Sequence, residues 1–203
     1  MDSSEPASAT NPGTTPPDQP KAPVDNPAAL AMLQAGDRAA FQTALRPLLP
    51  SLLTLARRLT GDHHWAEDLV QETLVRACRG IRGFRGECSL RTWLFQIQVR
   101  LAGQPSRWKG RHPDSGLGDL IVPDNLATQP GLDSEERELA GRLDEAMERL
   151  TTRQRTALHL RAVEGLDYRA IAQVLGGSDA ASRMLVLAAR RQILRRMGGH
   201  LLP

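Results

Sequence analysis

The chain has 203 residues, 40% hydrophobic and 24% charged, with 26 basic and 23 acidic side chains and a formal net charge of +3. This length suits one ordinary domain or two small ones, and the composition is typical of a folded soluble protein. The two cysteines, Cys78 and Cys88, are too few for a disulfide framework, no apolar run approaches the roughly 18 residues of a membrane span, and no secretory signal begins the chain. We therefore expect a soluble cytoplasmic protein with reduced thiols and no membrane insertion.

The charges are distributed unevenly along the chain. Residues 1–35 and 112–148 carry net charges of −3 and −8, whereas residues 36–111 and 149–203 each carry +7. A basic block of this size commonly contacts phosphate, although a solvated basic surface explains either block alone equally well. Two basic blocks on either side of an acidic one favour a protein that binds nucleic acid.

The N-terminal part of the chain changes from a tail to a helical segment near Pro27. Residues 1–27 hold half of the 14 prolines and have no apolar periodicity, which predicts a disordered tail. Residues 28–61 then predict two or three short helices, interrupted at Gly36, Pro47 and Pro50 and ended at Gly61. Residues 65–81 predict a further helix. One side of it is apolar and the other is polar, and this polar face fits solvent exposure and a docking surface equally well.

A basic turn precedes the next predicted helix, "SLRTWLFQIQVRLAG" at residues 89–103, for which Ser89 is a suitable N-cap. This helix combines an apolar stripe with a polar edge formed by Thr92, Gln96 and Arg100. The stripe consists of Leu90, Trp93, Leu94, Ile97 and Leu101. We interpret Trp93 as a packing residue at the border. The polar edge and the arginines of the turn have the chemistry that binds unpaired DNA.

The second half of the chain begins with a segment rich in Pro, Gly and Asp at residues 104–136, which predicts a flexible acidic linker. Residues 137–150 predict the first helix of a second domain. Thr151 and Gln154 form a capping-box pattern for the next helix, and Asp167 and Ser178 are suitable caps for the last two. The last helix has a predicted core face of Ser182, Val186, Ala189, Ile193 and Met197.

No period-two strand pattern occurs, so the sequence predicts an all-α protein with helical domains at residues 28–103 and 137–203. The last two helices, joined at Gly176–Gly177, have the pattern of a helix-turn-helix, whose second helix enters the DNA major groove. Arg183 lies near the start of this helix, and Arg190, Arg191, Arg195 and Arg196 lie further along for phosphate contacts. A plain helical bundle with an arginine-rich surface is the alternative.

The sequence contains no pattern typical of an enzyme or a metal site. It has no glycine-rich phosphate loop, nucleophile elbow or spaced pair of carboxylates. His63 and His64 could suggest a metal site together with Cys78 or Cys88, but adjacent histidines lack the spacing of ligands on one helix face. We therefore expect no catalytic residue, no cofactor and no metal.

Two segments resemble a known family. "DHHWAEDLVQETLVRACRGIRGFRGECSLRTWLFQIQVRLA", residues 62–102, resembles region 2 of bacterial sigma-70-type factors of the extracytoplasmic-function (ECF) group. "LTTRQRTALHLRAVEGLDYRAIAQVLG", residues 150–176, resembles the start of region 4 in the same group, and the resemblance extends from residue 36 to about residue 197. It implies an RNA polymerase sigma factor that binds core polymerase and promoter DNA and is held by an anti-sigma factor.

The resemblance also implies roles for individual residues. The helix at residues 65–81 would dock on the beta-prime clamp helices through Asp68, Gln71, Glu72, Arg76 and Arg79. The turn and helix that follow would recognise and melt the −10 element through Arg85, Glu87, Cys88, Ser89, Arg91, Thr92, Gln96 and Arg100. The second domain would contact the beta flap and read the −35 element through Tyr168, Arg169, Ser178, Arg183 and Arg190. The acidic linker would thread the RNA channel of the polymerase.

Three departures from the family pattern keep other functions open. The family usually has Asn at the position of Arg100 and Trp at that of Cys78, and Leu185, Leu187 and Ala188 replace basic or polar residues of the recognition helix. A sigma-like protein that binds polymerase or an anti-sigma factor without initiating transcription is one alternative. An ordinary helix-turn-helix regulator is the other, although it would not need residues 36–103.

Overall fold

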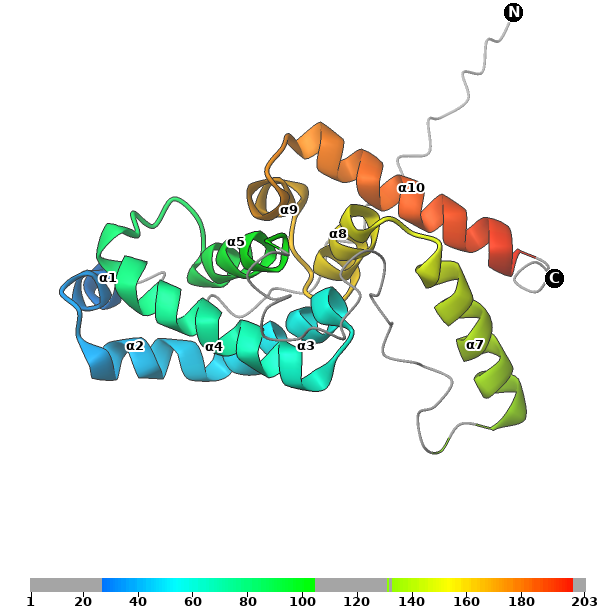
Figure 1. Cartoon of the computed structure of the whole chain (residues 1–203). Coiled ribbons are helices and arrows are strands. Elements are labelled where there is room, and N and C mark those ends of the chain that lie inside the picture. Colours follow the sequence, from blue (N-terminus) through cyan, green and yellow to red (C-terminus); the bar gives the residue numbers. More distant parts are fainter. Residues whose placement is uncertain (1–26, 105–130, 132, 199–203) are drawn as a thin grey trace, which may run out of the picture.

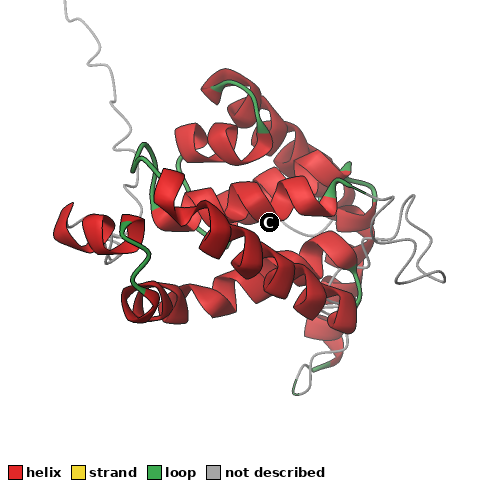
Figure 2. Cartoon of the chain, turned by 60° about the vertical axis from the view of Figure 1, so that its left-hand side comes forward, coloured by secondary structure: helices red, strands yellow, loops and turns green. Residues whose placement is uncertain are grey.

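The computed structural model describes residues 27–104, residue 131 and residues 133–198 (Figure 1). All of the predicted tail at residues 1–27 except Pro27, which begins the first helix, lies outside the described residues, as does most of the predicted linker at residues 104–136. Within the described ranges all regular secondary structure is helical, as predicted (Figure 2). A search of those same ranges finds no helix with the length and apolar character that crossing a membrane requires.

The first helical unit contains the helices predicted from the N-terminal half. They are α1 (Pro27–Gln34), α2 (Arg38–Leu45), η2 (Arg46–Leu48), α3 (Leu49–Thr60), α4 (His63–Gly80), η3 (Ile81–Gly83) and α5 (Leu90–Ala102). Pro47 and Pro50 lie in the first turns of η2 and α3, where a missing N–H breaks no helical hydrogen bond. The predicted end at Gly61 is confirmed, because this residue closes α3 with a left-handed φ of 69°.

The second unit contains α7 (Ser134–Glu148), α8 (Thr152–Ala162), α9 (Tyr168–Leu175) and α10 (Asp179–Met197). Its predicted caps are confirmed: the side chains of Thr151, Asp167 and Ser178 each accept a hydrogen bond from the backbone N–H three residues later. The first helix begins at Ser134 rather than near residue 137. A capping box between Asp133 and Glu136 initiates it within the segment that the composition assigned to the linker.

The two units pack against each other through α5 and α9 and through α3 and α8 (Figure 1). Their buried apolar side chains form one continuous cluster, from Leu33 of α1 to Val186 of α10. Gln98 of α5 lies fully buried within this cluster, where its amide donates to the backbone oxygen of Leu52 at 2.8 Å. The buried amide therefore ties α5 to α3, and both helices meet the second unit.

The predicted core face of α10 is confirmed, because Ser182, Val186 and Ala189 are buried and Ile193 and Met197 are half-buried. The apolar stripe of α5 is likewise on the inner side: Leu90, Leu94 and Leu101 are buried, and Trp93 and Ile97 are half-buried. Phe95 is also fully buried, although the sequence pattern did not assign it to the stripe. The inner side of α5 is therefore broader than an amphipathic pattern suggests.

Candidate functional site

The outer face of α4 is the first candidate surface. The helix begins where Asp62 accepts a hydrogen bond from the N–H of Trp65 at 2.7 Å, and its inner face buries Leu69 and Ala77. The outer face presents the residues implied in polymerase docking: Gln71 and Arg79 are exposed, and Asp68, Glu72 and Arg76 are half-buried.

The charges on this outer face are ordered along the helix. Asp68 lies in its first half, Glu72 lies at its middle and Arg79 in its last turn, and the Nε of Arg76 donates to Glu72 at 2.8 Å. Val75, 43% exposed, lies among these polar groups at helical spacing from Glu72 and Arg79. An apolar centre with a charged rim is the composition of a protein-docking surface.

The turn between η3 and α5 is the second candidate surface. Its base is anchored, because Phe84 is buried against the Trp93 ring at 5.0 Å between centroids and its backbone oxygen accepts from Gln34 at 2.7 Å. Its tip is open to solvent, and exposed Arg85 and Glu87 approach each other at 3.9 Å. The turn therefore presents charged groups on a fixed support.

The turn ends at Cys88 and Ser89, two of the residues for which the family resemblance implies DNA binding. Cys88 is half-buried, and burial, reinforced by the nearby charge of Glu87, raises the pKa of its thiol. The Oγ of Ser89 accepts from the N–H of Thr92 at 3.1 Å and lies 2.8 Å from the Thr92 hydroxyl, which confirms the predicted N-cap. Thr92 itself is only 3% exposed, so its hydroxyl completes the helix start in this conformation.

Of the remaining implied residues on α5, Gln96 is half-buried and Arg100 is exposed, whereas Arg91 is engaged by the second unit. The Nη2 of Arg91 donates to both the carboxylate and the backbone oxygen of Glu164, and its guanidinium lies 5.5 Å from the centre of the Phe95 ring. Glu164 lies between α8 and α9, 73 residues further along the chain. A group expected to meet DNA is thus occupied by the chain itself.

The Glu164 carboxylate is buried in a polar environment. Its Oε1 lies 3.5 Å from the Nε2 of His159, which is also buried. Burial alone would raise the pKa of Glu164, but hydrogen bonding to His159 and Ser51 and the charge of Arg91 outweigh this effect and lower it. The carboxylate therefore stays ionised where it joins helices of both units.

The helix-turn-helix unit is the third candidate surface. Tyr168 is half-buried between two guanidinium groups, with Arg161 5.1 Å and Arg183 4.9 Å from its ring centre. Arg169 and Arg190 are exposed. Ser178 is exposed and caps α10 through the N–H of Ala181. Sequence reasoning did not identify Arg161 as a member of this stack, because the stack forms only when α8, α9 and α10 are packed.

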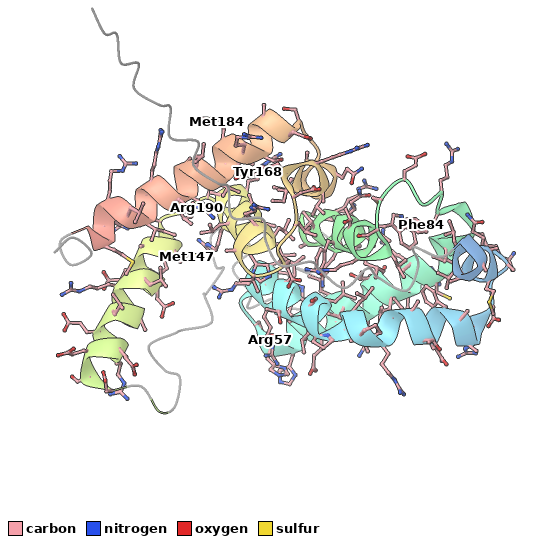
Figure 3. All side chains as sticks on the ribbon, turned by 180° about the vertical axis from the view of Figure 1, so that it is seen from behind. Arg57, Phe84, Met147, Tyr168, Met184 and Arg190 are labelled. Carbon is pink, nitrogen blue, oxygen red and sulfur yellow. The ribbon has the colours of Figure 1, made fainter. Side chains whose placement is uncertain are left out.

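The exposed start of α10 carries few side chains that can form hydrogen bonds. Besides Arg183 it presents Asp179, Ala180, Ala181 and Met184, which is 58% exposed. Figure 3 shows Met184 and Arg190 on this helix and Tyr168 at the start of α9. Few side chains here can donate a hydrogen bond to a base or phosphate, which agrees with the departure noted in the sequence.

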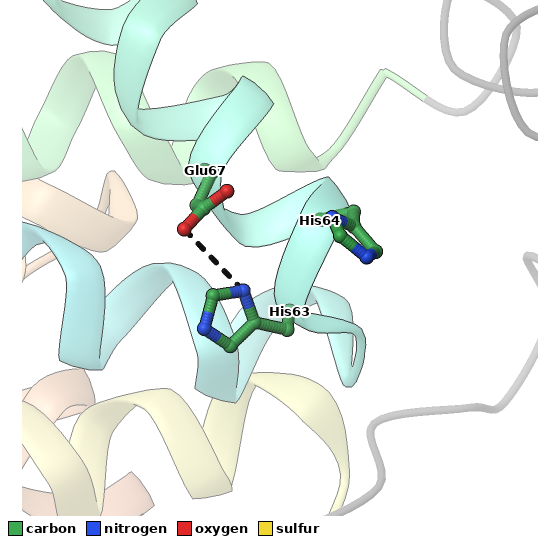
Figure 4. Close-up of side chains that lie close together, drawn as sticks. All are labelled: His63, His64 and Glu67. Atoms are coloured by element: carbon green, nitrogen blue, oxygen red, sulfur yellow. Dashed lines mark ion pairs between the residues drawn. The ribbon is translucent and has the colours of Figure 1, made fainter.

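The start of α4 also brings together three side chains that could bind a metal ion, namely His63, His64 and Glu67. One ligand-type atom from each lies within 4.8 Å of the others (Figure 4). All three are exposed, and neither cysteine belongs to the cluster. The ring nitrogens of His63 already have neighbours, with Nδ1 3.4 Å from Glu67 and Nε2 3.0 Å from the guanidinium of Arg57. The positive charge of Arg57 opposes the binding of a metal cation there.

Comparison with known proteins assigns both units. The sigma-70 region 2 family model matches residues 44–104, and the sigma-70 region 4 model matches residues 140–193. The chain is 30% identical over 176 residues to the RNA polymerase sigma-H factor of Pseudomonas aeruginosa, covering 79% of this chain and 88% of that protein. It is 32% identical over 178 residues to the ECF RNA polymerase sigma factor SigG of Mycobacterium tuberculosis, covering 77% of this chain and 48% of that longer protein.

A solved structure gives the same assignment. The chain resembles the sigma factor RpoE in complex with the anti-sigma factor NepR from Bartonella quintana, with a TM-score of 0.61 and 28% identity over 78% of this chain and 96% of that one. A region 2 unit followed by a region 4 helix-turn-helix defines a bacterial transcription initiation factor. The chain belongs to the sigma-70 family, in its extracytoplasmic-function group of RNA polymerase sigma factors.

Proposed function

We propose that the protein brings core RNA polymerase to specific promoters and opens the −10 region to start transcription. The observation that carries this proposal is the presence, in family order, of an exposed docking face on α4, an anchored polar turn before α5, and a capped helix-turn-helix. The protein itself would supply binding and strand separation. Nucleotide addition would belong to the polymerase, which implies that the protein is not an enzyme and acts in the bacterial cytoplasm.

The outer face of α4 would bind the beta-prime clamp helices. Its polar and charged residues, Asp68, Gln71, Glu72, Arg76 and Arg79, would set the register, and Val75 would supply the desolvated centre. The region 4 unit would contact the beta flap. In the domain organisation that we propose, residues 28–103 bind polymerase and the −10 element, and residues 137–203 bind the −35 element.

The turn before α5 would hold a base extruded from the −10 element. Extruding a base costs a few kcal/mol, which stacking and polar contacts in a pocket offset. Arg85, Glu87, Cys88 and Ser89 line the turn, and Gln96 and Arg100 extend the polar surface along α5. Arg91 would join them only after its contact with Glu164 is released, and Thr92 only after its hydroxyl leaves Ser89.

The start of α10 would read the −35 element with a small set of groups, namely Tyr168, Arg169, Ser178, Arg183 and Arg190. Each phosphate contact adds to the salt dependence of binding, with a slope of about −0.9 per neutralised phosphate on B-DNA. Because the exposed first turns of α10 carry few donors, we expect a weak −35 contribution to promoter affinity.

An anti-sigma factor is the proposed regulator. The similar sigma factor RpoE of Bartonella quintana is bound to the anti-sigma factor NepR. By analogy, an anti-sigma factor would cover the polymerase-docking face of this chain until a signal arrives. Such a partner would compete with core polymerase for α4.

Run-off transcription with purified core polymerase on genomic fragments tests the proposal. We expect discrete transcripts that require the protein and that weaken or vanish when the −10 sequence of a responding fragment is changed. Binding to core polymerase without transcripts would instead support a sigma-like interaction protein, which the sparse recognition helix keeps as the second candidate. Binding to duplex DNA without polymerase dependence would support an ordinary helix-turn-helix regulator.

A further inference from the structure

Helix α1 holds the turn between η3 and α5 at two points within the turn. The Nε2 of Gln34, a half-buried residue, donates to the backbone oxygen of Phe84 at 2.7 Å. Further along, Gly86 has a left-handed φ of 74°, and a Cβ atom there would lie 3.0 Å from the Cδ2 of Leu30. The left-handed φ and the close approach both favour glycine at this position. Gln34 and Leu30 therefore fix the middle of the turn against α1.

A third contact lies at the end of α1, which packs against η3 at the start of the turn (Figure 1). A Cβ atom on Gly36, two residues after the end of α1, would lie 3.2 Å from the Nη2 of Arg82. The carbonyl groups at a helix C-terminus carry partial negative charge, which attracts a guanidinium group. Residues 82, 84 and 86 of the turn thus all contact the α1 segment.

The charged residues between and after these contacts face away from α1. Arg85 and Glu87 are exposed, and the Nη1 of Arg85 lies 3.9 Å from the Oε1 of Glu87. The backbone at Phe84 is extended, with φ −73° and ψ 114°, and successive side chains of an extended chain point to opposite sides. Contact of the alternate residues with α1 therefore determines that Arg85 and Glu87 point outward.

Phe84 is held from two directions, by α5 and by α1. Its ring packs on Trp93 of α5 at 5.0 Å between centroids, and its backbone oxygen accepts from Gln34 of α1. The region 2 family match begins at residue 44, so it includes Phe84 and Trp93 but not Gln34 or Leu30. The family match thus assigns the turn and α5 to region 2 and leaves α1 without a role.

We propose that α1 is the positioning element of the −10 site and that Gln34 and Leu30 are its positioning residues. They hold the turn in the conformation in which Arg85 and Glu87 can meet an extruded base, and they themselves do not touch DNA. A turn that is fixed before binding loses less conformational entropy on binding than a loose one, and its polar groups keep the geometry that distinguishes one base from another. The identity of the ligand rests on the proposed function.

Amide hydrogen exchange at Phe84 tests this support without polymerase or DNA, because the N–H of Phe84 donates to the backbone oxygen of Ile81 at 3.0 Å within the turn. Gln34→Met keeps the length of the side chain and removes the donor. We expect the Phe84 amide to exchange about threefold to tenfold faster in this variant, which corresponds to the loss of one hydrogen bond. Gln42→Met is the matched control, because Gln42 is exposed on α2 and its side chain makes no contact with the turn.

Selection from a pool of short single-stranded DNAs of random sequence tests the consequence for DNA, with the full chain bound to core polymerase. We expect the wild type to enrich one sequence pattern. In Gln34→Met the enrichment should fall about fivefold, while the overall affinity for the pool stays within about twofold, because phosphate contacts do not depend on an exact base geometry. The affinity for core polymerase should not change.

A second pair of variants on α1 separates the supporting side of the helix from its open side. Leu30→Ala removes the side chain that contacts Gly86, and it should reduce the enrichment as Gln34→Met does. Met32→Ala truncates a residue of the same helix that is 50% exposed, and it should leave the enrichment unchanged. Equal effects of the two truncations would contradict a role for the side of α1 that faces the turn.

Unchanged exchange at Phe84 in Gln34→Met would overturn the positioning role, and so would faster exchange with unchanged enrichment. Parallel losses of enrichment, core affinity and helical circular dichroism signal would also overturn it, because Gln34 would then support the fold as a whole. A wild type that binds core polymerase but enriches no sequence would contradict the proposed function. The exchange comparison decides in either case whether α1 holds the turn.

Discussion

The outer face of α4 and the polar face of α5 both carry charged and amide side chains. They differ in whether another part of the chain covers them. Val75 and Arg79 on α4 face solvent, whereas Arg91 on α5 is held by Glu164 from the second unit. One surface is ready for a partner, and the other is partly occupied by the chain. In this conformation the outer face of α4 can meet a partner directly, whereas Arg91 on α5 can bind another group only after its contact with Glu164 is broken.

The largest difference that we expect between the two helices is in how much an alanine substitution lowers the free energy of unfolding. Phe95 is fully buried on α5 in the core cluster shared by both units, and replacing such a residue by alanine costs about 3–5 kcal/mol. We expect Phe95→Ala to lower the free energy of unfolding by this amount. Val75→Ala on the open face should change it by less than about 0.5 kcal/mol. Urea denaturation followed by circular dichroism measures both, and equal losses would show that α4 is not an open face.

The second effect concerns polymerase affinity. A carboxylate at the centre of a docking surface would be buried without a partner, so Val75→Glu should weaken binding to core polymerase by about tenfold or more. Leu49→Glu is the matched control, because Leu49 is 38% exposed at the start of α3, in the same unit but outside the proposed docking face. Biolayer interferometry with immobilised core polymerase measures both variants. Equal weakening by the two substitutions would contradict the assignment of α4.

The local features of both faces could be predicted from sequence. The caps at Ser89, Thr151, Asp167 and Ser178 follow from residues three positions apart, and the outer face of α4 follows from helical periodicity. Such features depend on neighbours along the chain, so the sequence pattern contains them directly.

The features that decide which face is covered depend on residues far apart in sequence. Gln34 meets Phe84 across 50 positions, Gln98 meets Leu52 across 46, and Arg91 meets Glu164 across 73. No periodicity connects such pairs. In the sequence, Arg91 is one of several basic residues near a turn, and Glu164 is one of three acidic residues in a basic block. Only the packing of the two units shows that they form a pair.

The third prediction distinguishes residues of α5 that stabilise the fold from residues that we propose contact promoter DNA. Arg100 is exposed and Gln96 half-buried, whereas Trp93 packs on Phe84 beneath the turn. We expect Gln96→Ala and Arg100→Ala to reduce promoter opening severalfold while leaving the free energy of unfolding within about 0.5 kcal/mol of the wild type. Trp93→Ala should lower both opening and stability. Permanganate reactivity of unpaired thymines measures opening, and equal loss of stability in all three variants would contradict this division.

The smallest effect concerns the pH dependence of stability that Glu164 contributes. Because the pKa of Glu164 is lowered in the folded protein, its stabilising contribution is complete above the ordinary glutamate pKa of about 4.3 and is lost as the pH falls through the lower folded value. The charged groups that face this carboxylate are Arg91 of α5 and, when protonated, His159 of α8. We therefore expect the wild type to lose more stability between pH 6 and pH 3 than Glu164→Gln does, with Glu138→Gln, which removes an exposed ion pair with Arg142 within α7, following the wild type. Urea midpoints measured across this range test the prediction, and parallel curves for wild type and Glu164→Gln would show that the covered face of α5 is held by its apolar surroundings rather than by the ion pair.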